Sequence, residues 1–240
     1  MLESFHPAVR TWFARRFPAG PTEPQAAGWA EIAADRHTLI AAPTGSGKTL
    51  AAFLVCIDRI YRAQAEQVPA DGPQVVYVSP LKALAVDIWQ NLERPLAEIA
   101  DVAAELGLPA PAIRVAVRTG DTAADERRKL ASKPPDVLIT TPESLFLLLT
   151  SKARETLRGV ETVIVDEVHA LAGNKRGAHL AVSLERLDAL RMATSEPDAA
   201  RGPAQRIGLS ATVRPVPEVA GFLGGARQVA VVQPPSGRPC

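Results

Sequence analysis

The chain has 240 residues, of which 47% are hydrophobic and 22% are charged. This is the composition of an ordinary globular protein with room for one large domain or two small ones, and it excludes a wholly disordered chain. The formal net charge of +1 provides no broad basic surface, so any contact with nucleic acid must come from local geometry. The two cysteines, Cys56 and Cys240, provide neither a disulfide framework nor a metal-binding spacing.

The N-terminal stretch MLESFHPAVRTWF lacks the apolar core and the small-residue cleavage site of a signal peptide. The longest apolar run, LFLLL at 145–149, is far too short to span a bilayer. We therefore expect a soluble, cytoplasmic protein that has no membrane partner.

Short runs rich in Val, Ile and Leu recur along the chain, and longer helical patterns such as 49–66 and 178–192 separate them. Nearly continuous apolar runs are typical of strands that are buried on both faces. Alternation of such strands with helices predicts an α/β fold with a doubly wound parallel sheet. The predicted strands are HTLIAA (37–42), QVVYVS (74–79), IRVAVRT (113–119), DVLITT (136–141), TVIVDE (162–167), RIGLSA (206–211) and QVAVVQ (228–233).

The first predicted strand leads into APTGSGKT (42–49), which has the form of a Walker A phosphate-binding loop with Ala42 in place of the usual glycine. Glycines let such a loop turn tightly, so that successive backbone N–H groups point at an anion. We expect Lys48 to reach the β and γ phosphates of ATP and the Thr49 hydroxyl to bind Mg²⁺. The predicted ATP-binding residues of the loop are Thr44, Gly45, Ser46, Gly47, Lys48 and Thr49. The alternative is a flexible loop in which Lys48 is only a solvated charge.

Two later segments, VSPLKALA (78–85) and TTPESLF (140–146), share one pattern. Each has a strand end, a hydroxyl residue suited to an N-cap, a proline suited to the first helical position, and then a helix. Helix N-termini at the carboxyl edge of a sheet bind phosphates without net positive charge. The candidate nucleic-acid contacts here are Ser79, Pro80, Lys82, Arg118, Thr119, Thr141, Pro142 and Glu143. Simple helix capping is the alternative for either segment alone.

Within the long helical run 81–106, Pro95 is expected to split the helix in two, because a proline ring clashes with the preceding turn.

The segment TVIVDEVHA (162–170) places two carboxylates at the end of a buried strand, and we expect that end to lie beside the phosphate-binding loop. Asp166 would then hold Mg²⁺, and Glu167 would orient or deprotonate the attacking water. A solvated strand terminus is the structural alternative. A metal hydrolase using both carboxylates and His169 is a weaker hypothesis, because no second histidine lies at ligand spacing.

The segment RIGLSATV (206–213) ends another predicted strand with the hydroxyls Ser210 and Thr212. Short hydrogen bonds from these groups would connect the γ phosphate to a nucleic-acid surface, although this segment alone says little. Prolines and glycines then follow the last strand, and 234–240 is interpreted as the start of a linker to an absent further domain.

Taken in order, GPTEPQ (20–25), APTGSGKT, SPLKALA, RTGDT (118–122), TTPESL, DEVH (166–169) and LSAT (209–212) resemble the first motor domain of superfamily 2 helicases. Within that superfamily, FHPAVRTWFARRF (5–17) and HALAGNKRGAHLAVSLERL (169–187) resemble the bacterial large helicase-related (Lhr) family. The resemblance covers nearly the whole chain and implies a RecA-like P-loop NTPase domain.

The resemblance also implies roles for individual residues. Gln25 would read adenine, so that ATP is preferred, and His169, Ser210 and Thr212 would couple hydrolysis to strand movement. The implied partners are single-stranded DNA or an RNA–DNA hybrid, a second motor domain and further C-terminal domains. The family's 3′ to 5′ movement and its link to DNA repair are implied in the same way. The second motor domain, with its arginine finger, is not in this sequence.

The expected organisation is therefore an N-terminal helical segment with the glutamine motif (1–36), a RecA-like ATP-binding domain (37–233) and a linker (234–240). The leading hypothesis is the motor domain of an ATP-dependent Lhr-type helicase. A DExH RNA helicase of another subfamily and a nucleotide-dependent binding module without turnover are alternatives. A small-molecule phosphotransferase is disfavoured, because nothing resembles an acceptor pocket or a lid.

Overall fold

A computed structural model describes residues 2–66, 72–193, 201–212 and 215–233. In these residues seven strands form one parallel sheet in the order β3-β4-β2-β5-β6-β1-β7. The strands are β1 (His37–Ala41), β2 (Val75–Val78), β3 (Val115–Arg118), β4 (Val137–Thr140), β5 (Thr162–Val165), β6 (Gln205–Ser210) and β7 (Val229–Val232). The predicted doubly wound parallel sheet is confirmed, and every predicted strand is present.

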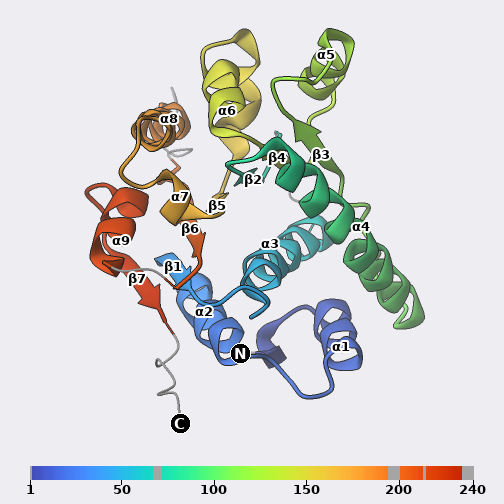
Figure 1. Cartoon of the computed structure of the whole chain (residues 1–240). Coiled ribbons are helices and arrows are strands. Elements are labelled where there is room, and N and C mark those ends of the chain that lie inside the picture. The colour runs from blue at the N-terminus through green and yellow to red at the C-terminus, as the bar shows by residue number, and fades with distance from the viewer. Residues whose placement is uncertain (1, 67–71, 194–200, 213–214, 234–240) are drawn as a thin grey trace.

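Helices cover both faces of the sheet, with α1 to α4 on one side and α6 to α9 on the other (Figure 1). The α-helices are α1 (Pro7–Arg16), α2 (Glu23–Ala33), α3 (Lys48–Ala65), α4 (Lys82–Glu105), α5 (Ala124–Ser132), α6 (Pro142–Leu149), α7 (Val168–Leu171), α8 (Lys175–Met192) and α9 (Val216–Gly224). Two 3₁₀ segments are η1 (Leu2–Ser4) and η2 (Lys152–Gly159). No helix of the described residues is both long enough and apolar enough to cross a membrane.

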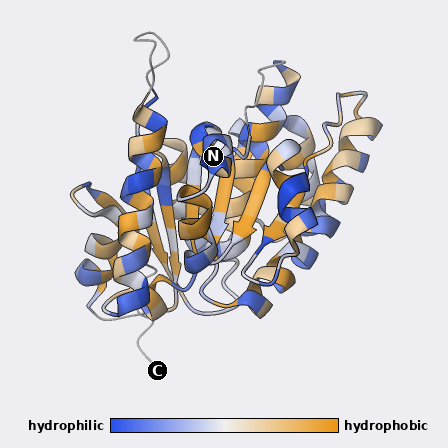
Figure 2. Cartoon of the chain, turned by 90° about the horizontal axis from the view of Figure 1, so that it is seen from above, coloured by the Kyte–Doolittle hydropathy of each residue, from blue (hydrophilic) through white to orange (hydrophobic). Residues whose placement is uncertain are grey.

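Alternation along the strands explains why both faces are covered. Ile40 faces the core beneath α1 to α4, whereas its neighbour Leu39 faces the core beneath α6 to α9. On β2, Tyr77 likewise faces the core beneath α1 to α4, and its neighbour Val76 faces the core beneath α6 to α9. Figure 2 shows the hydrophobic strands enclosed between helices whose hydrophilic residues turn outward. Apolar residues on both faces of a strand are what the continuous apolar runs predicted.

The N-terminal helices belong to the core on the first face of the sheet. Phe13 of α1 and Trp29 of α2 are fully buried, and their rings meet edge to face at 5.2 Å. Trp29 also donates from Nε1 to the carbonyl oxygen of Ala51 on α3, at 3.1 Å. The boundary predicted at residue 36 stays a prediction, and the linker predicted at 234–240 lies outside the described residues.

The prediction that Pro95 splits the helical run was wrong, because α4 continues unbroken through it. A proline inside a helix removes one N–H donor and costs about 3 kcal/mol. The carbonyl left without that donor belongs to Asn91, an exposed residue, so water can solvate it. Beyond the proline, Trp12 of α1 donates from Nε1 to Glu98 at 2.8 Å and holds the second half of α4 in place.

The prediction that Ser79 caps α4 and that Pro80 begins it was also wrong. The helix begins at Lys82, and its N-cap is Leu81, in an extended conformation. The hydroxyl of Ser79 instead donates to the carbonyl oxygen of Leu81 at 3.0 Å. The hydroxyl therefore stabilises a turn before the helix, which is a common alternative use of serine.

Candidate functional site

The loop between β1 and α3 turns at two glycines with positive φ angles. Gly45 has φ of 82° and Gly47 has φ of 81°, a region that glycine occupies without strain. Gly47 is the N-cap of α3, and no side chain of the described residues caps it. The first N–H groups of α3 are therefore free to bind an anion at the positive end of the helix.

Lys48 opens α3 and folds back over this loop. The residue is only 6% exposed, and its Nζ donates to the carbonyl oxygen of Pro43 at 3.3 Å. The ammonium group is therefore held at the phosphate-binding loop and is not an outward solvated charge. This position agrees with the predicted contact to phosphates.

Gln25 lies directly against the same loop. Thr22 and Gln25 form a capping box at the start of α2, and Nε2 of Gln25 also donates to the carbonyl oxygen of Gly47 at 3.3 Å. The Thr22 hydroxyl donates to the carbonyl oxygen of Ser46 at 2.9 Å. The glutamine motif therefore supports the phosphate-binding loop, while the adenine contact of Gln25 stays a prediction.

The two carboxylates after β5 are held in different ways. Asp166 is buried, and it accepts hydrogen bonds from the Tyr77 hydroxyl at 2.5 Å and from the Glu167 N–H at 2.9 Å. Burial raises the pKa of the Asp166 carboxyl, and the hydrogen bond from Tyr77 partly opposes that rise. Glu167 has φ of 45°, a left-handed conformation that is strained for a residue with a side chain. Such strain is often found at functional sites.

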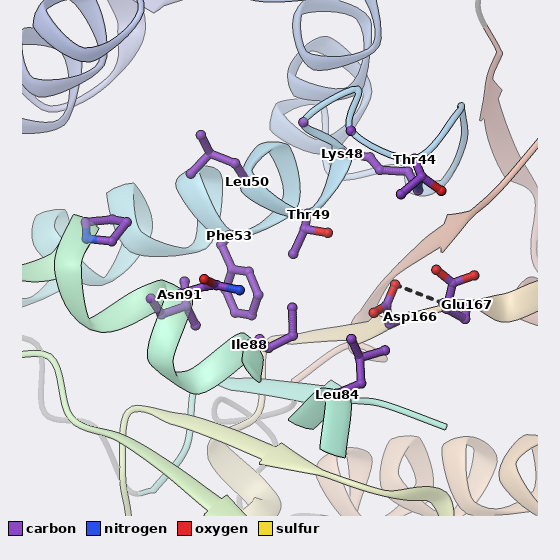
Figure 3. Close-up of a pocket in the computed structure, with 14 residues that line it drawn as sticks. Thr44, Lys48, Thr49, Leu50, Phe53, Leu84, Ile88, Asn91, Asp166 and Glu167 are labelled. Atoms are coloured by element: carbon purple, nitrogen blue, oxygen red, sulfur yellow. Dashed lines mark hydrogen bonds between the residues drawn. The ribbon is translucent and has the colours of Figure 1, made fainter. Parts of the chain in front are cut away.

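One cavity of about 420 Å³ joins the loop to these carboxylates. Strand β6 lies between β1 and β5, yet both segments reach the cavity because all of these strands end at the same edge. Figure 3 shows Asp166 and Glu167 across the cavity from Thr49 and Lys48. The wall between α3 and α4 is mostly apolar. The lining residues are Thr44, Gly45, Gly47, Lys48, Thr49, Leu50, Phe53, Leu84, Ile88, Asn91, Leu92, Pro95, Asp166 and Glu167.

His169 connects this cavity to the end of β6. Its Nε2 atom lies 3.3 Å from Oε2 of Glu167, and its Nδ1 atom lies 3.2 Å from the Ser210 hydroxyl. The structure therefore brings together Glu167, His169 and Ser210. Thr212, the remaining residue predicted for coupling, is exposed two residues beyond Ser210.

The segments predicted to bind a nucleic-acid strand also lie at the carboxyl edge of the sheet. Thr141 caps α6, where its hydroxyl oxygen accepts from the Ser144 N–H at 3.4 Å, and Pro142 takes the first helical position as predicted. Lys82, at the start of α4, forms an ion pair with Asp121 at 2.6 Å. Ser79 is fully buried, whereas Lys82 is exposed.

The segment from β3 folds beside Lys82. Thr119 is buried and accepts at its hydroxyl from the Asp121 N–H at 3.3 Å, and Arg118 is about half buried at the end of β3. Burial and the nearby Arg127 lower the pKa of Arg118. The contact of these residues with nucleic acid stays a prediction.

Arg176 was missed by the sequence analysis. Its Nε donates to Oε1 of Glu143 at 2.7 Å, and its Nη2 donates to the carbonyl oxygen of Pro80 at 2.8 Å. One side chain therefore ties together both helix-start segments. The signal in the sequence was a cation in the first turn of α8, where the helix dipole disfavours positive charge.

Tyr77, which holds Asp166, was also missed. In the sequence it is one apolar position of a strand pattern, but a buried tyrosine needs a partner for its hydroxyl. A tyrosine in an otherwise apolar buried strand was therefore the sequence signal that a polar partner lies nearby.

The donor set fits a magnesium ion that is shared with a nucleotide. Among the described residues no cluster of three or more His, Cys, Asp or Glu side chains could hold a metal by itself. Mg²⁺ needs few protein ligands, since substrate phosphates and waters complete its shell. Thr49 and Asp166 line the same cavity and supply the oxygens that this arrangement requires.

A family model described as "DEAD/DEAH box helicase" matches residues 22–219. Two curated relatives are similar over nearly all of this chain. The "Lhr helicase/ probable uracil glycosylase" of Mycolicibacterium smegmatis is 58% identical over 99% of the chain. The "Lhr helicase/uracil glycosylase" of Escherichia coli is 56% identical over 98% of it. The chain spans only 15% of the length of each of these relatives.

Among solved structures, Mycobacterium smegmatis helicase Lhr bound to ssDNA and AMP-PNP superimposes with a TM-score of 0.87 and 58% identity. That match covers 98% of this chain and 28% of the other. The helicase MrfA, at 23% identity and a TM-score of 0.78, supports the fold alone.

Proposed function

The chain belongs to the DEAD/DEAH box helicase family, in its Lhr branch, and on that premise we propose that it is the ATP-binding first motor domain of a nucleic-acid translocase. The observation that supports this best is the single cavity shared by Lys48, Thr49, Asp166 and Glu167. A phosphate-binding loop that faces two carboxylates at the carboxyl edge of a parallel sheet is the arrangement that phosphoryl transfer requires.

In the proposed mechanism, the free N–H groups at the start of α3 and the ammonium group of Lys48 bind the β and γ phosphates. Asp166 and Thr49 would hold Mg²⁺, which would neutralise charge on the phosphates. Glu167, the more exposed carboxylate, orients the attacking water and accepts its proton. Gln25, held against Gly47, would contact the adenine.

We further propose that His169 couples movement of the Glu167 carboxylate to movement of the segment after β6. Its two ring nitrogens face Glu167 and Ser210, so a shift of the carboxylate during hydrolysis would change both contacts. Thr212, exposed beyond Ser210, would transmit the change toward bound nucleic acid.

We propose that a single nucleic-acid strand binds along the edge formed by the starts of α4 and α6. Phosphate contacts would come from the backbone N–H groups of these helices, from Thr141 and from Lys82, with Arg118 and Thr119 beside them. Contacts of this kind explain how a chain of net charge +1 could bind a polyanion. The solved M. smegmatis relative is bound to ssDNA, which favours DNA as the loading strand here.

Full activity is proposed to need a second motor domain. Charge that develops on the transferred phosphoryl group requires a cation from the facing side, and an arginine finger contributes roughly 10³–10⁵ in rate. Arg206 cannot serve, because its guanidinium is buried against Asp188. The relatives are far longer than this chain, which is consistent with further domains in the whole protein. Movement from 3′ to 5′, action on RNA–DNA hybrids and a role in repair are the finer parts of the proposal.

The test compares steady-state ATP hydrolysis by this chain with that by a longer protein that continues through the next motor domain. Both are measured with saturating single-stranded DNA and with single-stranded RNA. We expect the short chain to bind ATP but hardly to hydrolyse it, and the long protein to be stimulated by DNA. Equal rates would refute the need for a second domain, and stimulation by RNA alone would favour an RNA helicase of another subfamily.

The direction of movement along a nucleic-acid strand is tested separately, with the longer protein. A 3′ to 5′ translocase displaces streptavidin from the 5′ end of a biotinylated strand and leaves it on the 3′ end. The reverse result would contradict the proposed direction without affecting the ATP site.

A further inference from the structure

Tyr77 is a buried polar side chain beside the nucleotide site. It lies on β2, next to β5 in the sheet, and points toward the face covered by α3 and α4. The residue is fully buried, and its hydroxyl donates to Oδ2 of Asp166 at 2.5 Å. A hydrogen bond to a carboxylate is short and strong, particularly where water is excluded.

The carboxylate of Asp166 is held at both oxygens. The Glu167 N–H donates to Oδ1 at 2.9 Å, while Tyr77 donates to Oδ2. Two donors on opposite oxygens fix the plane of the carboxylate and still leave lone pairs for other ligands. The backbone N–H of Asp166 also donates to the carbonyl oxygen of Val78 at 2.9 Å. Strand β2 therefore holds both the backbone and the side chain of Asp166.

Tyr77 is itself fixed by Phe53 of α3. Their rings stack with centroids 5.0 Å apart and an angle of 17° between planes. Phe53 lines the cavity that contains Thr49 and Asp166 (Figure 3). Phe53 therefore lies on α3, the helix that carries Thr49, and Tyr77 lies on β2, next to the strand that leads into Asp166.

We infer that Tyr77 is a positioning residue for the metal-nucleotide site, and that its hydroxyl orients the Asp166 carboxylate for binding of Mg²⁺ together with ATP. This inference rests on the proposed function of Asp166. A carboxylate that must turn before it can bind the ion loses part of the free energy of binding, whereas a fixed one does not. Tyr77 has no contact of its own with substrate in this role.

The test is Tyr77→Phe, which keeps the ring stacked on Phe53 and deletes only the hydroxyl. Titration calorimetry measures ATP affinity with Mg²⁺ and with EDTA, and the ratio of the two reports the magnesium-dependent part of binding. We expect Tyr77→Phe to lower this ratio about ten-fold, the scale of a lost hydrogen bond to a charged group, and to leave affinity in EDTA unchanged.

Tyr61→Phe is the matched control. Tyr61 is also buried in the core on this face, but its hydroxyl has no hydrogen-bond partner among the described residues. Removing that hydroxyl should leave the ratio as in the wild type. An unchanged or increased ratio in Tyr77→Phe would overturn the inference, and so would an equal loss in both variants.

Two further variants distinguish a specific effect of the Tyr77 hydroxyl on magnesium-dependent binding from a general loss of folding. In an Asp166→Asn background Tyr77→Phe should cause no additional loss, because the carboxylate that it positions is gone. Phe53→Leu keeps the Tyr77 hydroxyl but removes the stacked ring, and it should give a smaller loss of the ratio. An additional loss in the Asp166→Asn background would contradict the inference. Absence of any magnesium-dependent ATP binding in the wild type would instead refute the proposed function.

Discussion

The Nε2 atom of His169 lies 3.3 Å from Oε2 of Glu167, the carboxylate proposed to orient the attacking water. The opposite ring nitrogen faces Ser210, so the imidazole lies between Glu167 and the end of β6. His169→Ala should therefore keep ATP affinity and lose most of the stimulation of ATP hydrolysis by single-stranded DNA in the longer protein. His179→Ala is the control, since His179 packs on Phe146 of α6 instead. Normal stimulation in His169→Ala would exclude a coupling role.

Glu167→Gln should separate binding from turnover. An amide cannot accept the proton of the attacking water, so ATP hydrolysis by the longer protein should fall by roughly 10²-fold or more, while Mg-ATP affinity stays the same. Steady-state hydrolysis and calorimetry measure the two properties. Glu161→Gln, at the opposite end of β5, is the control. Wild-type hydrolysis in Glu167→Gln would mean that this carboxylate is structural.

Lys48→Ala should weaken ATP binding about ten- to a hundred-fold, because a contact between ammonium and phosphate is worth roughly 1.5–3 kcal/mol. Calorimetric titration of this chain with Mg-ATP measures the change. Lys152→Ala, in η2 and away from the lining of the cavity, should leave the affinity unaltered. Equal affinity in Lys48→Ala and the wild type would show that the loop does not bind phosphates as proposed.

Thr141→Ala removes the cap of α6 and a proposed phosphate contact. Helix capping alone predicts a loss of about 0.5–2 kcal/mol in the free energy of unfolding. The proposal adds weaker binding of single-stranded DNA, by a similar factor for every base sequence, because phosphates carry no sequence information. Thr141→Ser keeps the hydroxyl and should preserve both properties. A folded Thr141→Ala with unchanged DNA affinity would favour simple capping, as measured by fluorescence anisotropy.

A buried ion pair lies near the amino end of β6, and removing one of its partners should be costly. Arg206 and Asp188 lie 2.6 Å apart, and each side chain is only 2% exposed. Asp188→Asn leaves Arg206 with Glu185 as its one remaining carboxylate partner among the described residues and also removes the pair of Asp188 with Arg227. The change should lower the free energy of unfolding in urea by roughly 3–5 kcal/mol. Glu105→Gln breaks the exposed pair with Arg15 and should change stability little. Similar midpoints for the two variants would contradict this expectation.

The strands were predictable because a fully buried parallel strand reads as a continuous apolar run, as in 74–79 and 162–167. The phosphate-binding loop was predictable because few residue types satisfy its backbone, and Gly45 and Gly47 do have the positive φ angles that it requires. In both cases the local structure restricts which residue types can occur, so the residue types indicate the structure.

The start and the continuity of α4 were not predictable, because tertiary contacts decide them. Leu81 has no capping side chain, and Pro95 is tolerated where Trp12 holds the second half of the helix. Tyr77 and Arg176 were missed for a related reason. Their partners lie 89 and 96 residues away in the chain, so no local pattern links them to the site.

Arg176 donates both to Glu143 at the start of α6 and to the Pro80 carbonyl just before α4. One guanidinium thus connects the two helix starts that we propose to contact a nucleic-acid strand, and it would hold them at one spacing. In the proposed complex, the distance between the phosphates contacted at α4 and at α6 would then be set by this domain alone. Translocation along nucleic acid, as proposed, would then require a change in the distance between this domain and a second one, with the starts of α4 and α6 moving together.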